Sequence, residues 1–199
     1  MPFEPRNYIM ISVEVTDEDV RDLSAEIKNL PGALFGTGSP LLRPFLSRLE
    51  ELLPPEKRGL GDNYISSTLK AHVEAVVADE EHIRVESEGR AVEITRGELA
   101  AVLEEKFPTL DHQSLNLPGL LFLQSGPILQ ACTLRRLDRD HGVRVPGGRR
   151  THRYVFHTTV VSVGADRDGV RVGFDLDRLP KLSGGAASEG ASGSAGSEP

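Results

Sequence analysis

The amino-acid sequence predicts an α+β fold in which helices and β-hairpins follow one another in irregular order. Long segments place apolar side chains every three or four positions, which is the period of an amphipathic helix. Shorter segments rich in β-branched residues alternate apolar and polar positions, as strands do. Because the two patterns do not form a regular strand–helix–strand series, the sequence favours α+β over a doubly wound α/β sheet.

In the first half of the chain we expect one strand, three helices and a hairpin. The first helix begins at Thr16, a capping residue that three acids follow. The second begins at Ser39-Pro40, which supplies a cap and a proline in the first turn. The expected elements are a strand at Tyr8–Val15, helices at Thr16–Lys28, Ser39–Leu53 and Asn63–Ala78, and strands at His82–Ser87 and Ala91–Ile94 around the turn Glu88-Gly89-Arg90.

The second half begins with a helix that carries a capping-box pattern. In Thr95-Arg96-Gly97-Glu98, the threonine and the glutamate can each accept a hydrogen bond from a backbone N–H group of the first turn. The stretch from Pro108 to Gln124 fits a strand, a short helix or a buried loop equally well. The other expected elements are helices at Thr95–Phe107 and Pro127–Asp140, strands at Val143–Val145 and His152–Val163, and a hairpin that turns at Ala165–Gly169 into Val170–Asp175.

Composition divides the chain into three parts. Residues 183–199 are nearly all Gly, Ala, Ser, Glu and Pro, and such a segment buries too little apolar surface to fold. We therefore expect an acidic α+β region at residues 1–94, a basic region at residues 95–182 and a disordered tail. Residues 39–94 also run helix, helix, hairpin, so a tandem of two similar units, the first used for dimerisation, is one hypothesis.

The bulk properties of the chain favour a cytoplasmic protein. The single cysteine, Cys132, excludes an internal disulfide and fits a reducing compartment. The longest apolar run, Leu117–Leu123, is far too short for a membrane span, so no membrane partner is expected. The N-terminus lacks the charge pattern of a signal peptide.

The most informative feature of the sequence is a basic stretch inside an acidic chain. The 199 residues carry a net charge of −7, whereas residues 126–157 contain seven arginines and two aspartates, a net charge of +5. The arginines fall in two groups, one on an expected helix and one around a glycine turn. Positive charge gathered in this way is typical of a site for a polyanion.

The order of helix, connection, basic helix and glycine-rich hairpin resembles a winged helix-turn-helix. The resemblance covers about residues 95–157 and is architectural, since the sequence contains no residue motif of a named family. It implies that Pro127–Asp140 is a recognition helix for the major groove. It further implies that Val143–Val145 and His152–His157 are the wing strands and that Gly147–Thr151 is a wing tip that lies near phosphate.

Six arginines are the candidate nucleic-acid-binding residues. Arg135 and Arg139 lie four residues apart on one helix face, with Arg136 beside them, and would contact a groove. The planar guanidinium group can bind a phosphate or a guanine edge through two hydrogen bonds. The arginines expected to contact phosphate are Arg149, Arg150 and Arg153.

The sequence therefore predicts a non-enzymatic protein that binds DNA or RNA, such as a transcription regulator or an accessory factor. The alternative is an interaction or assembly module whose basic face docks an acidic partner, with a homodimer as one form. This alternative remains open because Arg135 and Arg139 can also pair locally with Asp138 and Asp140.

The sequence gives weaker support to other chemistry. Asp138, His141, His152 and His157 lie near one another along the chain, but their spacing matches no known zinc site, so no metal is expected. Gly36-Thr37-Gly38 lacks the later glycine and the preceding strand of a dinucleotide loop, so no cofactor is expected. No residue is assigned a catalytic role.

Overall fold

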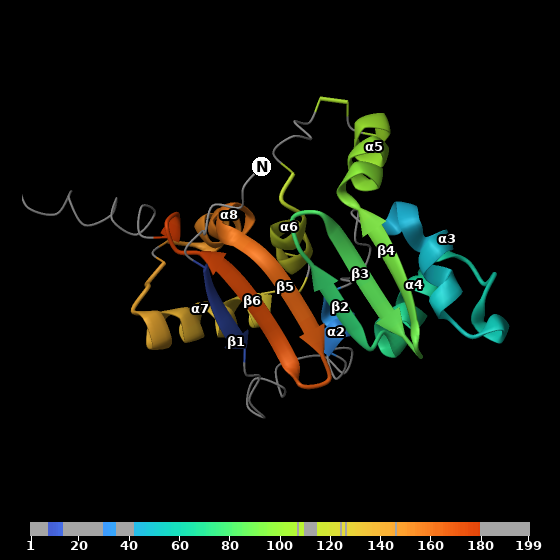
Figure 1. The fold of residues 1–199 in the computed structure, drawn as a ribbon, viewed down its shortest axis with the longest axis horizontal. Helices are drawn as coiled ribbons and strands as arrows, with labels where there is room; N and C mark the ends of the chain where they lie inside the picture. Colours follow the sequence, from blue (N-terminus) through green and yellow to red (C-terminus); the bar gives the residue numbers. More distant parts are fainter. Residues whose placement is uncertain are drawn as a thin grey trace, which may run out of the picture.

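The computed structural model describes residues 8–13, 30–34, 42–106, 108–109, 115–123, 125, 127–145 and 147–179. In these ranges the chain forms one six-stranded antiparallel sheet and a set of helices (Figure 1). The predicted α+β class is confirmed. No helix in this part of the chain is both long and apolar enough to cross a membrane.

The sheet joins strands from distant parts of the sequence. The strands are β1 (Tyr8–Val13), β2 (Ala75–Ala78), β3 (His82–Ser87), β4 (Arg90–Thr95), β5 (Val160–Asp166) and β6 (Gly169–Asp175). Their order is β1-β6-β5-β2-β3-β4, so the C-terminal hairpin lies between β1 and β2 (Figure 1). The boundary expected between residues 94 and 95 therefore does not separate two sheets.

The helices gather on one face and at the sides of the sheet (Figure 1). They are α2 (Leu30–Ala33), α3 (Leu46–Leu49), α4 (Asp62–His72), α5 (Arg96–Lys106), α6 (Leu117–Leu123), α7 (Pro127–His141) and α8 (Arg149–Thr159), with 3₁₀ turns at Arg43–Phe45, Glu50–Leu52 and Pro55–Lys57. Helix α6 contacts β2, β3, β5 and α8, whereas α7 packs along the edge strand β1.

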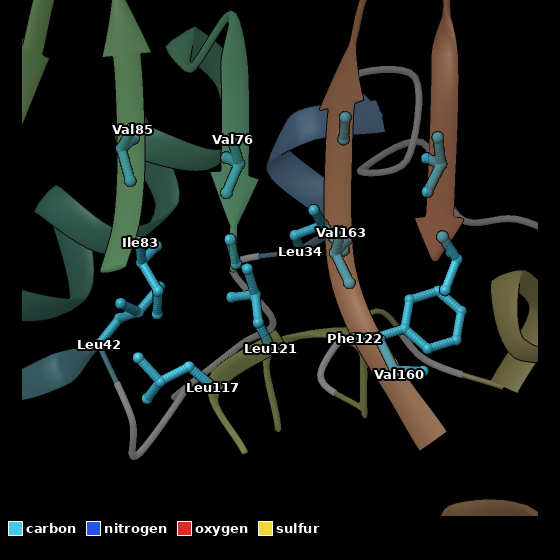
Figure 2. Packing of buried hydrophobic residues seen from close by; sticks show 14 of the residues in the cluster. Leu34, Leu42, Val76, Ile83, Val85, Leu117, Leu121, Phe122, Val160 and Val163 are labelled. Atoms are coloured by element: carbon cyan, nitrogen blue, oxygen red, sulfur yellow. The ribbon is translucent and has the colours of Figure 1, made fainter. Parts of the chain in front are cut away.

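The hydrophobic core lies between the sheet and α6. Leu117, Leu121 and Phe122 of α6 are fully buried and point toward the strands (Figure 2). Alternate residues of each strand face them, as Val76 and Ile83 do. The opposite face of the sheet carries exposed side chains, including Tyr8, Met10 and Val77. This alternation is expected when helices cover only one face of an antiparallel sheet.

Most of the predicted elements in the described residues are confirmed. The strand at Tyr8–Val13, the β3–β4 and β5–β6 hairpins, and the helices α5 and α7 form where the periodicity placed them. The helix expected at Ser39–Leu53 appears, from residue 43 on, as a short α-helix between 3₁₀ turns. Between Pro108 and Gln124, residues 117–123 form α6. The helix expected at Thr16–Lys28 and the tail lie outside the described residues.

The helix expected at Asn63–Ala78 ends early, and this prediction is wrong at its C-terminal end. Helix α4 ends at His72, and Ala75–Ala78 form β2. Strand β2 pairs with β3 on one side and with β5 on the other. Val76 and Val77 suit a helix stripe and a strand equally, and pairing with two neighbouring strands decides the outcome.

The two wing strands are also not formed. Residues 149–159, which include most of the second expected strand, are helix α8, and Val143–Val145 is assigned to neither helix nor strand. The segment is helical because its buried side chains have helical spacing. Val155, Phe156 and Thr159 reach the core and share one side of a helix. The glycine-arginine segment is therefore the start of a helix and not the tip of a hairpin.

Candidate nucleic-acid interface

Close backbone packing against α6 fixes the position of α8. A Cβ atom on Gly119 would lie 2.8 Å from the carbonyl oxygen of Phe156 and 3.1 Å from Cα of His157, so a glycine is required at this contact. The Asn116 side chain, just before α6, donates hydrogen bonds to the carbonyl oxygens of His157 and Val160 at the end of α8. These contacts satisfy carbonyl groups that a helix end leaves without partners.

Aromatic packing fixes how α8 is rotated about its axis. The ring of Phe156 meets Phe122 of α6 edge to face, with 5.0 Å between the ring centroids. Its centroid lies 6.4 Å from that of Phe174 in β6. With Phe156 directed into the core, the opposite side of α8 faces solvent.

The solvent side of α8 carries a basic stripe that includes a tyrosine. Arg150, Arg153, Tyr154 and His157 have the spacing i, i+3, i+4, i+7, which places them along one helix face. Arg150 and Arg153 are exposed, Tyr154 is 58% exposed, and His157 is half-buried. We call these four residues the α8 stripe.

The N-terminus of α8 adds to the positive potential. Its N-cap residue, Gly148, has no side chain that could cap the helix, and its first turn contains no acid. Arg149 and Arg150 lie in that first turn, where the helix dipole disfavours a cation. A bound anion would be favoured at such a position, because it interacts with Arg150 and with the N–H groups of the turn.

The arginines of α7 are largely engaged within their own helix. The Arg136 guanidinium bonds to the Asp140 carboxylate at 2.5 Å and, with a smaller contribution from Arg139 at 3.3 Å, lowers the pKa of Asp140. Arg144 lies 3.6 Å from Asp138. These pairs reduce the positive charge that α7 can offer to a ligand.

The structure brings only some of the six predicted arginines together. Arg135 donates to the sulfur of Cys132 at 3.1 Å, and the Arg136 side chain is 25% exposed, so the α7 arginines do not form one open face. Arg150 and Arg153 share the α8 stripe, while the side chain of Arg149 lies outside the described part of the structure. Sequence reasoning missed Tyr154, which the helical spacing of residues 150–157 would have placed beside the two arginines.

Neither other side-chain clusters nor comparisons with known proteins point to a different site. Among the described residues, no group of three or more His, Cys, Asp or Glu side chains is arranged to hold a metal ion. Searches of protein-family models, curated proteins and solved structures gave no match.

Proposed function

We propose that this protein binds nucleic acid through the α8 stripe, with phosphate at Arg150 and Arg153 and an unpaired base on Tyr154. The observation that carries the proposal is an exposed aromatic ring beside two exposed arginines on one helix face. Arginine binds phosphate through its planar group, and the exposed face of a tyrosine can stack on a base. Stacking of this kind needs a base that is not already inside a duplex.

The pairing of the α7 arginines favours a single strand over a duplex groove. A recognition helix reads base edges with side chains that are free to reach them. On α7, Arg136 and Arg139 bond to Asp140 instead. The proposed ligand is therefore single-stranded RNA or DNA, and its phosphates contact α8 near its first turn.

Fluorescence anisotropy with a labelled single-stranded oligonucleotide tests this proposal. We expect binding at low salt that weakens as salt is added, because each phosphate contact releases counterions. The double variant Arg150→Ala, Arg153→Ala should bind at least about ten-fold more weakly, since charge-assisted hydrogen bonds contribute about 1.5–3 kcal/mol each.

The matched control for the double variant is Arg167→Ala. Arg167 is an arginine of the β5–β6 turn whose side chain is 82% exposed, and its ion pair with Glu74 lies at the surface. The affinity of this variant should equal that of the wild type. Absence of binding to single strands at low salt would overturn the proposal.

The alternative function is a module that docks an acidic protein partner. It is favoured by the same exposed arginines, because carboxylates and phosphates both bind guanidinium groups. The two functions differ at Tyr154, since base stacking needs the ring whereas carboxylate binding does not. Recovery of a stable protein complex that survives Tyr154→Ala, without nucleic-acid binding, would support this alternative.

A further inference from the structure

A hollow of about 390 Å³ opens on the face of the sheet that the helices leave uncovered. Its walls come from β1, β5, β6 and the turn between β2 and β3. These strands are neighbours in the sheet, although they lie far apart in the sequence (Figure 1). The volume is within the range of sites for small molecules.

The pairing of the strands explains why the sheet is hollow at this point. Gly173 of β6 pairs with Met10 on one side and with Ser162 on the other. The Ser162 hydroxyl takes the place that a Cβ atom on Gly173 would fill, and the Met10 methyl group would lie 3.5 Å from such an atom, so a larger residue at 173 would displace the side chains that line the hollow. Strand β2 ends at Ala78, which pairs with Val163, so no residue of β2 pairs with Ser162.

A bulge in β5 lies at the same level. The pairing of β5 with β6 shifts between Val160 and Ser162, so Val161 is an extra residue, and it lines the hollow. A glycine inside a strand and a bulge beside it often occur where a strand must leave room for a ligand. Here the glycine, the bulge and the end of β2 at Ala78 all lie at the hollow.

The two sides of the hollow differ in chemistry. Tyr8 and Met10 of β1 are 45% and 59% exposed and form an apolar side. The turn Asp79-Glu80-Glu81 forms an acidic side. The Asp79 carboxylate accepts hydrogen bonds from the N–H groups of Glu81 and His82, while no ion pair of Glu81 occurs among the described residues.

Among the described residues, the positive groups that contact this turn include Arg96 and His82. The side chain of Arg96 donates to the carbonyl oxygen of Glu80 at 3.4 Å, and the His82 ring lies 3.1 Å from the Asp79 carboxylate. Because no described cation pairs with Glu81, its carboxylate makes the potential beside it negative.

We propose that this hollow binds a small organic cation that has an apolar body, such as an alkyl or aryl amine. The ammonium group lies near Glu81 and the turn, where the carboxylates attract it and the Tyr8 ring offers a cation–π contact. The apolar body packs against Met10 over Gly173. This site is separate from the α8 stripe, and it selects the opposite charge.

Methyl NMR tests the proposal directly, because the sequence contains only two methionines, Met1 and Met10. In protein labelled with ¹³C-methyl methionine, the variant Met10→Leu identifies the signal from the hollow. The probes are 2-phenylethylamine, 2-phenylethanol and 3-phenylpropionate, which share an aryl body and differ in charge. The amine should shift the Met10 signal saturably, the alcohol more weakly, and the carboxylate least.

Two substitutions locate the binding. Gly173→Ala should abolish the saturable shift, whereas Gly164→Ala should keep it, because a Cβ atom on Gly164 would meet only the Arg171 side chain at 3.8 Å. Glu81→Gln should lower the affinity for the amine about two- to five-fold, which is the effect expected from the loss of a partly exposed ion pair. This variant tests the proposal even if Gly173→Ala does not fold. Equal shifts with all three probes, or no saturable shift with the amine, would overturn the proposal.

Discussion

At the scale of single residues, Tyr154 is the side chain that separates a nucleic-acid site from a general site for anions. Loss of one base–aromatic stack costs about 1–3 kcal/mol. Tyr154→Ala should therefore weaken the binding of a single-stranded oligonucleotide by about 5- to 150-fold in an anisotropy titration, while inorganic phosphate competes equally well against both proteins.

Tyr64 provides the control for that experiment. It is 46% exposed on α4, so Tyr64→Ala removes a similar aromatic surface from another part of the molecule. Its affinity should match that of the wild type. If both tyrosine variants bind as the wild type does, the ligand contacts only the arginines.

Single residues also show what a sequence can predict about a site. The arginines of residues 126–157 were identifiable from charge alone, because charge needs no knowledge of the fold. The sequence could not identify which of these arginines can reach a ligand. The bond from Arg136 to Asp140 and the contact of Arg135 with Cys132 depend on side-chain conformation. Tyr154 could be placed beside Arg150 and Arg153 only once residues 149–159 were known to be helical.

At the scale of elements, the contact between α6 and α8 orients the proposed site. Gly119→Ala should destabilise the fold by about 1–3 kcal/mol, because its Cβ atom would press on the backbone of α8 at Phe156 and His157. Gly97→Ala in α5 is the matched control, since the nearest atom would be 4.0 Å from its Cβ. It should raise stability by about 0.5–1 kcal/mol, as an alanine in a helix does.

Urea denaturation measures both of these variants, and their order of stability is the test. If Gly119→Ala is as stable as Gly97→Ala, the close approach of α6 to α8 is not needed to hold α8 in place. In that case the rotation of the α8 stripe toward solvent would lose its structural basis.

The capping box of α5 was predicted from the sequence and gives a prediction about pH. The Glu98 carboxylate accepts hydrogen bonds from the N–H and hydroxyl groups of Thr95, and it pairs with Arg48 at 2.8 Å. The hydrogen bond from Thr95, followed by the one from Arg48, lowers the pKa of Glu98 below its ordinary value.

The sign of the resulting pH dependence follows from that lowered pKa. The contribution of Glu98 to stability is present above the pKa that it has in the unfolded chain and is lost as pH falls through the lower, folded value. Glu98→Ala should thus be less stable than the wild type at pH 7, and the difference should shrink in acid. Chemical denaturation at several pH values measures it, and a constant difference would contradict this account.

At the scale of the whole molecule, the order of the strands makes the two halves of the chain depend on each other. Strands β5 and β6 lie between β1 and β2, so each half supplies neighbours that the other needs. A fragment of residues 95–182 should therefore be unfolded by circular dichroism and amide exchange, whereas the full chain should unfold in one transition. A folded fragment would instead support the division expected at residue 94.

Local patterns predicted most of the elements but not this arrangement. Helical and strand periods are properties of neighbouring residues, so α5, α7 and the β3–β4 hairpin could be read from the sequence. The pairing of Val76 with Ala165 joins segments that are distant along the chain. That pairing turned an expected helix end into β2, and no local period reports it.

The salt dependence of binding tests the central claim most directly. The logarithm of the association constant for a single-stranded oligonucleotide should fall with the logarithm of salt concentration, by about 0.7 for each phosphate contact. Removing Arg150 and Arg153 together should reduce this slope by about 1.4, while Arg167→Ala should leave it unchanged. An unchanged slope in the double variant would contradict the assignment of α8 as the nucleic-acid-binding face.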